Sequence, residues 1–400
     1  MKLLIVADLH AFQKPRKPFP SLVNFSDVDR NPTSDPLLGL RTMFEDKTID
    51  VPDVFLCAGD LADRADPLAL KSAWSELQAI QKDYDIPAFI ATCGNHDLDT
   101  RHQENRFDPK GYLRKLEPSF PLPGYGKNDI EQLKYWSNNF SIVEGDSWRI
   151  LTINSCAYHG YGPEAEPELL QGRISEHTLA EIKSELKTLK GGVRGKFNVC
   201  LVHHHLREMH TDAQPDQSRM QGSENLLSLL SKAEFGEWFI VHGHVHRGDL
   251  YCEGGNSGPI VLSCASFSVS LQGDHLNPST NQFYSVKFDD PVGGRHRIRG
   301  SVQAWDWSAS YGWEQASEKQ GSIGPDAGFG FRGDIPNFAE SMIDRVRSIG
   351  KLEWRSALIE FPELRHFLPS DRENLVKELE ATGDIKVSRT GKNIREVVLK

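Results

Sequence analysis

The sequence lacks both a long apolar run and a close pair of cysteines. No stretch contains the roughly 18 apolar residues that a membrane-spanning helix needs, so we expect no membrane association. The six cysteines include no C-x-x-C pair, and four of them lie within apolar runs. This pattern favours reduced core thiols over a disulfide framework. Together these absences predict a soluble cytoplasmic protein.

Positive charge is also scarce. The chain has 46 Lys and Arg residues against 56 Asp and Glu residues, a formal net charge of -10. This balance argues against a broadly basic surface that coats nucleic acid, although it leaves room for a local basic patch. With 400 residues, 38% of them hydrophobic, the chain is long enough for a large core and more than one domain.

What the sequence does contain is one arrangement that occurs five times, in which an apolar run is followed by side chains that bind metals. The runs and the side chains that follow them are 3–7 with Asp8 and His10, 54–58 with Asp60 and Asp63, 88–93 with Asn95 and His96, 197–202 with His203, His204 and His205, and 238–241 with His244 and His246. Each run is typical of a buried strand, and one sheet can bring the five strand ends together. Residues two apart in an extended chain point the same way, so Asp8 and His10 can bind one cation together.

These side chains suit a site for two cations. The Asp60 carboxylate has two oxygens and can bridge both. Asp8, His10 and His246 can complete the first cation, and Asn95, His203 and His244 the second. This mixed nitrogen and oxygen set without thiolates suits Mn best, with Fe, Zn or Ni as other possibilities.

Two neighbouring residues are candidates for catalysis on a phosphate held by such a cation pair. His96 follows the ligand Asn95 and is placed to protonate or stabilise a leaving oxygen. Asp63 is the second candidate, because a carboxylate at this position can orient a ligand histidine. Metals roughly 3.5–4 Å apart can hold the phosphate oxygens for in-line displacement.

The ordered motifs resemble the calcineurin-like metallophosphoesterases over about residues 1–310. The resemblance implies an α/β fold, a double β-sandwich flanked by helices, with two metals at the strand ends. It also implies that His203 is the ligand within the run of three histidines. The segment Gly59-Asp60-Leu61-Ala62-Asp63 is similar to the cyclic-nucleotide phosphodiesterase branch, since the repair exonucleases usually have His where Asp63 stands.

Substrate contacts are harder to assign from sequence. His204, His205, Arg101 and Arg106 are candidates, and for the two histidines a packing role is at least as strong an interpretation. His159, His210 and His275 are interpreted as surface or loop residues.

The C-terminal part has a different pattern, three candidate helices and then two β-type runs around Gly391. This order predicts a small winged-helix-like domain over 335–400, after a catalytic domain at 1–315 with insertions at about 11–36 and 98–127, and a linker at 316–334. The hairpin carries four candidate nucleic-acid contacts, Lys386, Arg389, Lys392 and Arg395. The domain could instead bind a partner protein, and the sequence leaves the oligomeric state unknown.

We therefore expect a phosphodiesterase that uses two divalent metals to hydrolyse a nucleic acid or a nucleotide, with a nuclease slightly favoured. One alternative is a phosphodiesterase for cyclic nucleotides or other small molecules. Another is a DNA-binding or complex subunit in which the metal site is regulatory.

Overall fold

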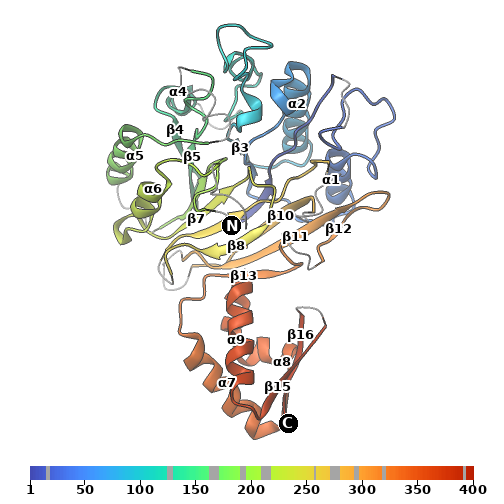
Figure 1. The fold of residues 1–400 in the computed structure, drawn as a ribbon, viewed down its shortest axis with the longest axis vertical. Helices are drawn as coiled ribbons and strands as arrows, with labels where there is room; N and C mark the ends of the chain where they lie inside the picture. The colour runs from blue at the N-terminus through green and yellow to red at the C-terminus, as the bar shows by residue number, and fades with distance from the viewer. Residues whose placement is uncertain are drawn as a thin grey trace.

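The structure is a computed structural model, and its elements are labelled in Figure 1. It describes residues 1–14, 19–123, 129–161, 171–189, 195–208, 218–255, 258–270, 280–291, 297–317, 321–390 and 393–400. His210, His275 and Lys392, which the sequence analysis names, lie outside these ranges.

Two large sheets form the N-terminal part of the molecule. The first has the order β12 (Gly312–Gln315), β11 (Gly300–Ser308), β10 (Gln282–Phe288), β1 (Lys2–Val6), β2 (Val54–Cys57) and β3 (Ala88–Ala91), with β13 (Ala327–Phe329) against β11. The second has the order β4 (Phe140–Glu144), β5 (Trp148–Ile153), β6 (Phe197–Leu201), β7 (Trp238–His242), β9 (Ile260–Ser263) and β8 (Asp249–Cys252). The β1–β2–β3 and β5–β6–β7–β9 pairings are parallel.

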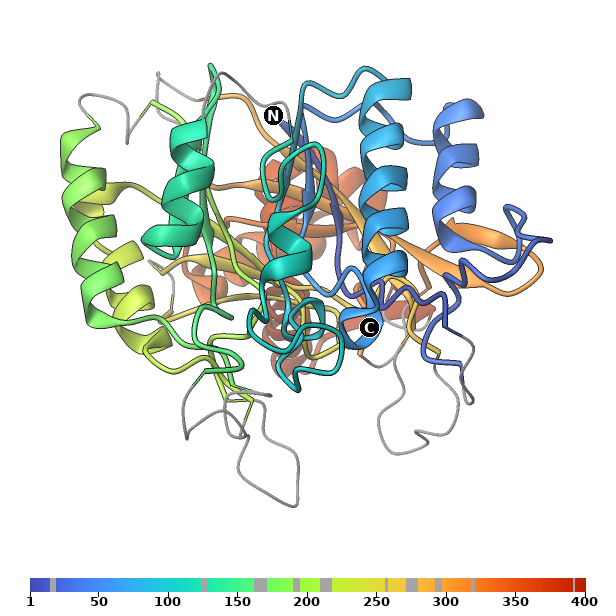
Figure 2. The ribbon, with the colours of Figure 1, turned by 90° about the horizontal axis from the view of Figure 1, so that it is seen from above.

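Helices cover the outer faces of the two sheets. They are α1 (Pro36–Glu45), α2 (Pro67–Asp83), α3 (Gly111–Arg114), α4 (Asp129–Ser137), α5 (Glu176–Thr188) and α6 (Ser223–Leu230). Seen from above in Figure 2, α1 and α2 lie on one side of the strands and α5 and α6 on the other. The result is a four-layer arrangement of helices, sheet, sheet and helices.

The alternation of side chains along β1 explains the layers. Leu3 and Ile5 belong to the core between the two sheets, whereas Leu4 and Val6 belong to the core beneath α1 and α2. A strand that is buried on both faces has a continuous apolar sequence. This is why the five motif strands are recognisable as apolar runs.

The two helices on the first sheet begin at the same local signal. Asp35 accepts hydrogen bonds from the backbone N–H groups of Leu37 and Leu38, and Asp66 accepts from those of Leu68 and Ala69. A proline follows each aspartate, where its fixed φ suits the first helical turn. Asp66 thereby fixes the start of α2 just after the motif that contains Asp60 and Asp63.

The C-terminal domain has the winged-helix order. It consists of α7 (Ile335–Ile349), β14 (Lys351–Glu353), α8 (Trp354–Glu360), α9 (Pro369–Ala381), β15 (Ile385–Thr390) and β16 (Asn393–Leu399). Met342, Leu352, Leu375 and Val397 are among the buried residues of its own core. In Figure 1 it lies below the sheets, next to β13 and β8.

The connection between the two parts differs from the predicted linker. Within 316–334, Ala316, Ile323 and Phe329 are buried in the core between the sheets, and β13 pairs with β11. The segment is therefore part of the sandwich over much of its length, because its few apolar residues fill the open edge of that core. The segment is rich in Gly and Ser, so its few apolar residues form no periodic pattern that predicts a strand.

The C-terminal domain also packs onto this sandwich. Leu368, which precedes α9, is buried in the core between the sheets, and Arg372 of α9 donates a hydrogen bond to the backbone oxygen of Asp326. His366 lies 2.6 Å from a carboxylate oxygen of Asp289. The N-terminal end of α9 is thus a contact surface within the chain.

Among the described residues, no helix is long and apolar enough to span a membrane.

Candidate metal centre

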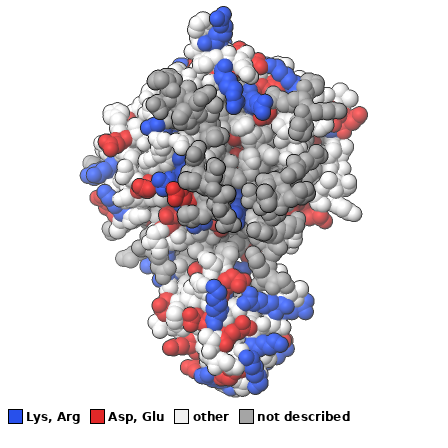
Figure 3. Space-filling view, viewed as in Figure 1, with Lys and Arg blue, Asp and Glu red and all other residues white. Residues whose placement is uncertain are grey.

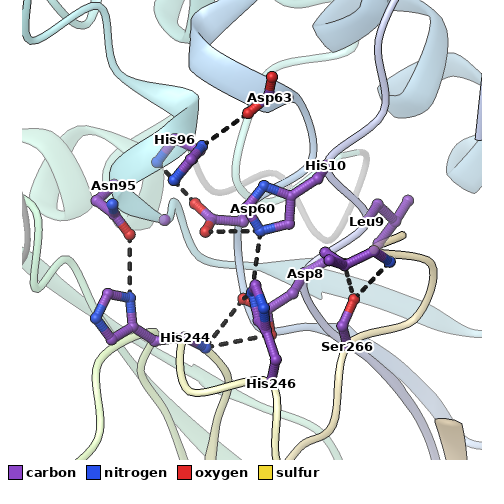
Figure 4. A network of polar contacts seen from close by, with 12 residues as sticks. Asp8, Leu9, His10, Asp60, Asp63, Asn95, His96, His244, His246 and Ser266 are labelled. Carbon is purple, nitrogen blue, oxygen red and sulfur yellow. Dashed lines mark hydrogen bonds and ion pairs between the residues drawn. The ribbon is translucent and has the colours of Figure 1, made fainter. Parts of the chain in front are cut away.

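The metal-type side chains lie on loops that follow five parallel strands. β1, β2 and β3 belong to the first sheet, and β6 and β7 belong to the second. Figure 4 shows side chains from both sets pointing into one common space. The sequence analysis expected a single sheet to bring them together. The site instead lies where the carboxyl ends of strands from two facing sheets meet, because the shared core holds those sheets against each other.

One group consists of Asp8, His10, Asp60 and His246. Their potential ligand atoms all lie within 4.8 Å of one another. The Nε2 atoms of His10 and His246 are 3.1 Å apart, and Asp8 Oδ1 lies 3.5 Å from His246 Nε2. Two imidazoles and two carboxylates that converge in this way fit one divalent cation.

A second group consists of Asn95, His203 and His244. Asn95 Oδ1 lies 3.1 Å from both His203 Nε2 and His244 Nδ1, and these two nitrogens are 3.3 Å apart. His203 Nδ1 donates to the backbone oxygen of Ala58 at 2.8 Å, which directs Nε2 toward the group. Nε2 is therefore the ring atom that could bind a cation once its proton is released.

Asp60 lies between the two groups. Its Oδ2 is 3.3 Å from His10 Nε2 and 3.4 Å from His203 Nε2. Burial alone would raise the pKa of this carboxyl, but the charges of His203, His96 and His10 outweigh burial and hold the pKa well below its usual range. An ionised carboxylate between two ligand groups fits the bridging position, so the residues present fit a pair of divalent cations.

The backbone of the site is not extended. Five of the predicted ligands have positive φ: Asp8 at 55°, His10 at 47°, Asp60 at 53°, His244 at 73° and His246 at 52°. Each such residue costs about 1–3 kcal/mol and is typical of functional sites. The period-two argument used for Asp8 and His10 is therefore wrong. Left-handed turns that the surrounding packing maintains aim these side chains inward.

Two glycines allow the close approach of these loops. A Cβ atom on Gly94 would lie 2.1 Å from Asp60 Oδ1, and one on Gly59 would lie 2.6 Å from His203 Nδ1. Gly59 also has a φ of +96°. Any side chain at Gly94 would displace the carboxylate between the two groups, which explains why a glycine precedes Asn95.

His96 and Asp63 form a pair beside the metal groups. His96 Nδ1 lies 3.1 Å from Asp63 Oδ1, and the backbone N–H of His96 donates to Asp60 Oδ1 at 2.8 Å. Burial lowers the pKa of His96, but Asp60 and Asp63 together raise it above the usual value. The ring is thus oriented and biased toward the protonated form. The sequence analysis expected Asp63 to orient a ligand histidine, whereas its described hydrogen bond is to His96.

Three other histidines are buried, which for His204 and His205 favours the packing interpretation over substrate contact. His204 and His205 have no exposed surface, so neither is available to a substrate. The chain turns inward after His203, and their rings lie 4.4 Å and 5.7 Å from that of His244. His159, interpreted as a surface or loop residue, is also fully buried and bonds to the backbone oxygen of Gln171.

The predicted arginines separate into one that lines the site and one that does not. A pocket of about 120 Å³ lies next to His96 and Asn95, with Arg101 and Arg64 in its wall. Arg106 is not among the lining residues, and its guanidinium lies 6.0 Å from the ring centre of Phe107. Sequence analysis missed Arg64, although its position directly after Asp63 was the available signal.

The predicted nucleic-acid contacts on the C-terminal hairpin are only partly free. Lys386 and Arg395 are exposed, whereas Arg389 pairs with Glu373 at 3.1 Å. Figure 3 shows basic and acidic residues interspersed over the described surface of this domain. The hairpin is therefore less strongly basic than its sequence suggests.

Two facing sheets that gather His, Asp and Asn at their strand ends define a hydrolase with a dinuclear metal site. A family model described as calcineurin-like phosphoesterase matches residues 1–258, and a model described as a calcineurin-associated wHTH matches residues 327–381. The first model covers more than half of the sequence, so the chain belongs to the calcineurin-like phosphoesterase family. It is a metal-dependent phosphoesterase with a C-terminal winged-helix-type domain.

The solved structures to which the chain is similar are distant in sequence. The chain is similar to a dimetal phosphatase from Danio rerio, with 12% identity, 77% of this chain and 99% of that chain covered, and a TM-score of 0.48. It is also similar to a phosphopantetheinyl hydrolase from Mycobacterium tuberculosis, with 13% identity, 70% and 98% covered, and a TM-score of 0.33. No curated protein matches the sequence.

Proposed function

We propose that this phosphoesterase hydrolyses a phosphodiester of a nucleotide or a nucleic acid, with a small nucleotide as the favoured substrate. The observation that carries the proposal is the oriented His96 next to Asp60 and to the pocket that contains Arg64 and Arg101. The preference for a nuclease from sequence alone is reversed, because the pocket is small and the C-terminal domain uses its third helix for contact with the sandwich.

The residues of the chain would act as follows. Divalent cations bound to the two groups would neutralise charge on the phosphoryl oxygens and acidify the attacking water. His96 would donate a proton to the leaving oxygen, and Asp63 would maintain the required ring orientation. At 34% exposure, the His96 side chain is accessible to a substrate, unlike His204 and His205.

The pocket suggests which diester is bound. Arg64 and Arg101 offer two guanidinium groups beside His96, and Asn95 and Thr100 add polar atoms. One guanidinium group can bind two phosphate oxygens through two parallel hydrogen bonds. We expect them to bind a second anionic group of the substrate, outside the diester that is cleaved.

A nuclease is the second candidate, and one observation favours it. Lys386 and Arg395 are exposed on the hairpin of the winged-helix domain, where a wing can contact a DNA backbone. Against this, the N-terminal end of α9, the part that reads bases in helix–turn–helix proteins, contacts Asp326 of the sandwich region. A protein partner remains another possible ligand of this domain.

The choice of cation and compartment completes the proposal. The nitrogen and oxygen ligands suit Mn, with Fe, Zn or Ni as alternatives. The six cysteines are free thiols, which agrees with the reducing cytoplasm.

The test uses the full-length chain loaded with Mn²⁺ and assayed on bis-p-nitrophenyl phosphate, cyclic nucleotides, dinucleotides, single-stranded DNA and duplex DNA. We expect turnover of the small diesters. The double variant Lys386→Glu with Arg395→Glu should change that turnover by no more than about twofold, since both residues lie on a separate domain. Lys71→Glu with Lys187→Glu, both exposed on helices, is the matched charge control.

The outcomes separate the candidates. Loss of DNA cleavage in the hairpin variant, but not in the control, would support the nuclease over the small-nucleotide enzyme. Two bound metals with no turnover of any diester would contradict the proposal and favour a regulatory metal site.

A further inference from the structure

A second cluster of potential ligands lies behind the dinuclear site. Cys156 and His159 belong to the loop after β5, and His204 directly follows the predicted ligand His203. None of the three side chains has exposed surface. One potential ligand atom from each lies within 4.8 Å of the other two. The proposed hydrolysis does not use this cluster, so the three side chains have no role assigned above.

His159 contributes a bare nitrogen to the cluster. Its Nε2 lies 2.9 Å from the backbone oxygen of Gln171, and a carbonyl only accepts, so Nε2 carries the hydrogen. Burial lowers the pKa of His159 to about 4, and the ring is therefore neutral with a lone pair on Nδ1. That Nδ1 atom is buried and has no hydrogen-bond partner among the described residues. Such an atom is costly unless something binds it.

His204 and Cys156 supply the other donors. His204 Nδ1 lies 2.8 Å from Ser155 Oγ and 4.0 Å from Cys156 Sγ, while its buried Nε2 has no partner in the part of the chain that is described. The Cys156 thiol lies 3.5 Å from the backbone oxygen of Cys93 and 4.0 Å from His204 Nδ1, and it also interacts with the side chain of Cys93. Three soft or borderline donors thus share one buried space with incomplete hydrogen bonding.

We propose that Cys156, His159 and His204 form a third metal site, which binds a borderline or soft cation such as Zn²⁺. One thiolate and two imidazoles select Zn²⁺ or Co²⁺ over Mn²⁺ and Mg²⁺, which prefer oxygen ligands. The Ser155 hydroxyl, next to His204 Nδ1, offers an oxygen as a fourth ligand. Cation binding releases the thiol proton of Cys156, so the buried site gains one negative charge that offsets part of the cation.

The site would have a structural role. It would join the loop after β5, which includes Cys156 and His159, to the loop after β6 that positions His203. The rings of His204 and His159 have centroids 5.4 Å apart, and those of His204 and His244 are 4.4 Å apart. A cation here would therefore fix His204 against the back of the dinuclear site without contacting the substrate.

The chemical difference between the two sites provides the test. The dinuclear site has no thiolate ligand, so only the third site can give a thiolate-to-cobalt charge-transfer band. Because the cluster is fully buried, the cation must enter during folding. The full-length chain should therefore be produced in medium with Co²⁺ as the only added transition metal, and then analysed for metal content and near-ultraviolet absorption.

We expect three cobalt ions per chain and a charge-transfer band. Cys156→Ser should remove the band and one ion, and His159→Ala should remove one ion although it retains the thiol. Cys200→Ser is the matched control, because Cys200 is also fully buried but lies outside the cluster. Cys252→Ser controls for the half-exposed thiol.

Two outcomes would overturn the proposal: wild-type protein with two ions and no band, or a band that survives Cys156→Ser. If Cys156→Ser does not fold, the wild-type spectrum and His159→Ala decide. The variant Asp60→Asn separates this inference from the proposed function. It should lose ions of the dinuclear site and keep the band, whatever the enzyme hydrolyses.

Discussion

The metal centre and the winged-helix domain both contain many charged residues, but they use them in opposite ways. At the centre, Asp8 and Asp60 are at most 1% exposed, and the neighbouring His10 and His203 are buried as well. In the C-terminal domain, residues 332–400 have 13 basic and 12 acidic residues, and its ion pairs are on the surface. Arg345 and Glu360, with side chains 41% and 35% exposed, are one such pair.

This difference shows where the chemistry of the chain resides. Exposed ion pairs contribute about 0–1 kcal/mol each, because water screens them. Buried carboxylates and imidazoles that converge are unfavourable unless cations bind them, and left-handed backbone at five of the predicted ligands adds to that cost. Buried charged groups and left-handed backbone therefore destabilise the fold at the candidate metal centre, whereas the winged-helix domain keeps its charged groups on the surface.

Asp60→Asn should have the largest effect on this contrast. The change keeps the shape but removes the charge between the two metal groups, so at least one cation should be lost and turnover should fall by roughly 10³-fold or more. Metal analysis of the purified variant and diester hydrolysis measure the two effects. Two retained metals would rule out a bridging role for Asp60.

His96→Ala should reduce kcat by about 10²–10⁴-fold while both metals remain bound, because the proton donor is lost but no ligand is. Kinetics on a diester together with metal content check this expectation. His177→Ala, on the exposed face of α5, is the control and should behave like wild type. Near-normal turnover in His96→Ala would remove the role assigned to His96.

Asp63→Asn should be milder, with a loss of about 10–100-fold, since the carboxylate only orients the His96 ring. The alkaline limb of the kcat profile, along which the general acid His96 loses its proton, should also move to lower pH. Asp63 raises the pKa of His96, and without that charge the imidazolium loses its proton at lower pH. A variant that loses activity with an unshifted pH profile would indicate a role in folding alone. Asp83→Asn is an exposed control.

Arg64→Ala should have the smallest effect of these four. We expect KM to rise by about 10-fold with little change in kcat, because one guanidinium contact to the anionic substrate is lost from the pocket. Arg106→Ala is the matched control, since Arg106 is exposed and lies outside the lining of that pocket. Equal KM values for the two variants would contradict substrate binding in the pocket.

Much of the metal centre could be predicted from the sequence. The five apolar runs are β1, β2, β3, β6 and β7, and each is followed by the predicted ligands. These strands are buried on one or both faces, so their sequences are continuous and easy to recognise. The helices α1 and α2 each begin at an Asp-Pro pair, a start signal that is local in sequence.

Other features could not be predicted because they depend on residues distant in sequence. Leu368 and the strand β13 fill the open edge of the core between the two sheets. No local sequence pattern predicts this contact. His204 and His205 resemble site residues in sequence, but the turn after His203 buries them. Arg64 belongs to the pocket through a backbone φ of 51°, a strained value that local propensity disfavours.

The sequence by itself determined which candidate ligand types the chain offers, the order in which they follow the strands, and the family to which the catalytic part belongs. It could do so because apolar periodicity and ligand chemistry are local properties of the chain. The tertiary structure alone decided that two sheets share the site, that His159 joins Cys156 and His204 in a buried cluster, and that α9 contacts the sandwich. Those outcomes depend on packing between segments far apart in sequence, which no single stretch encodes.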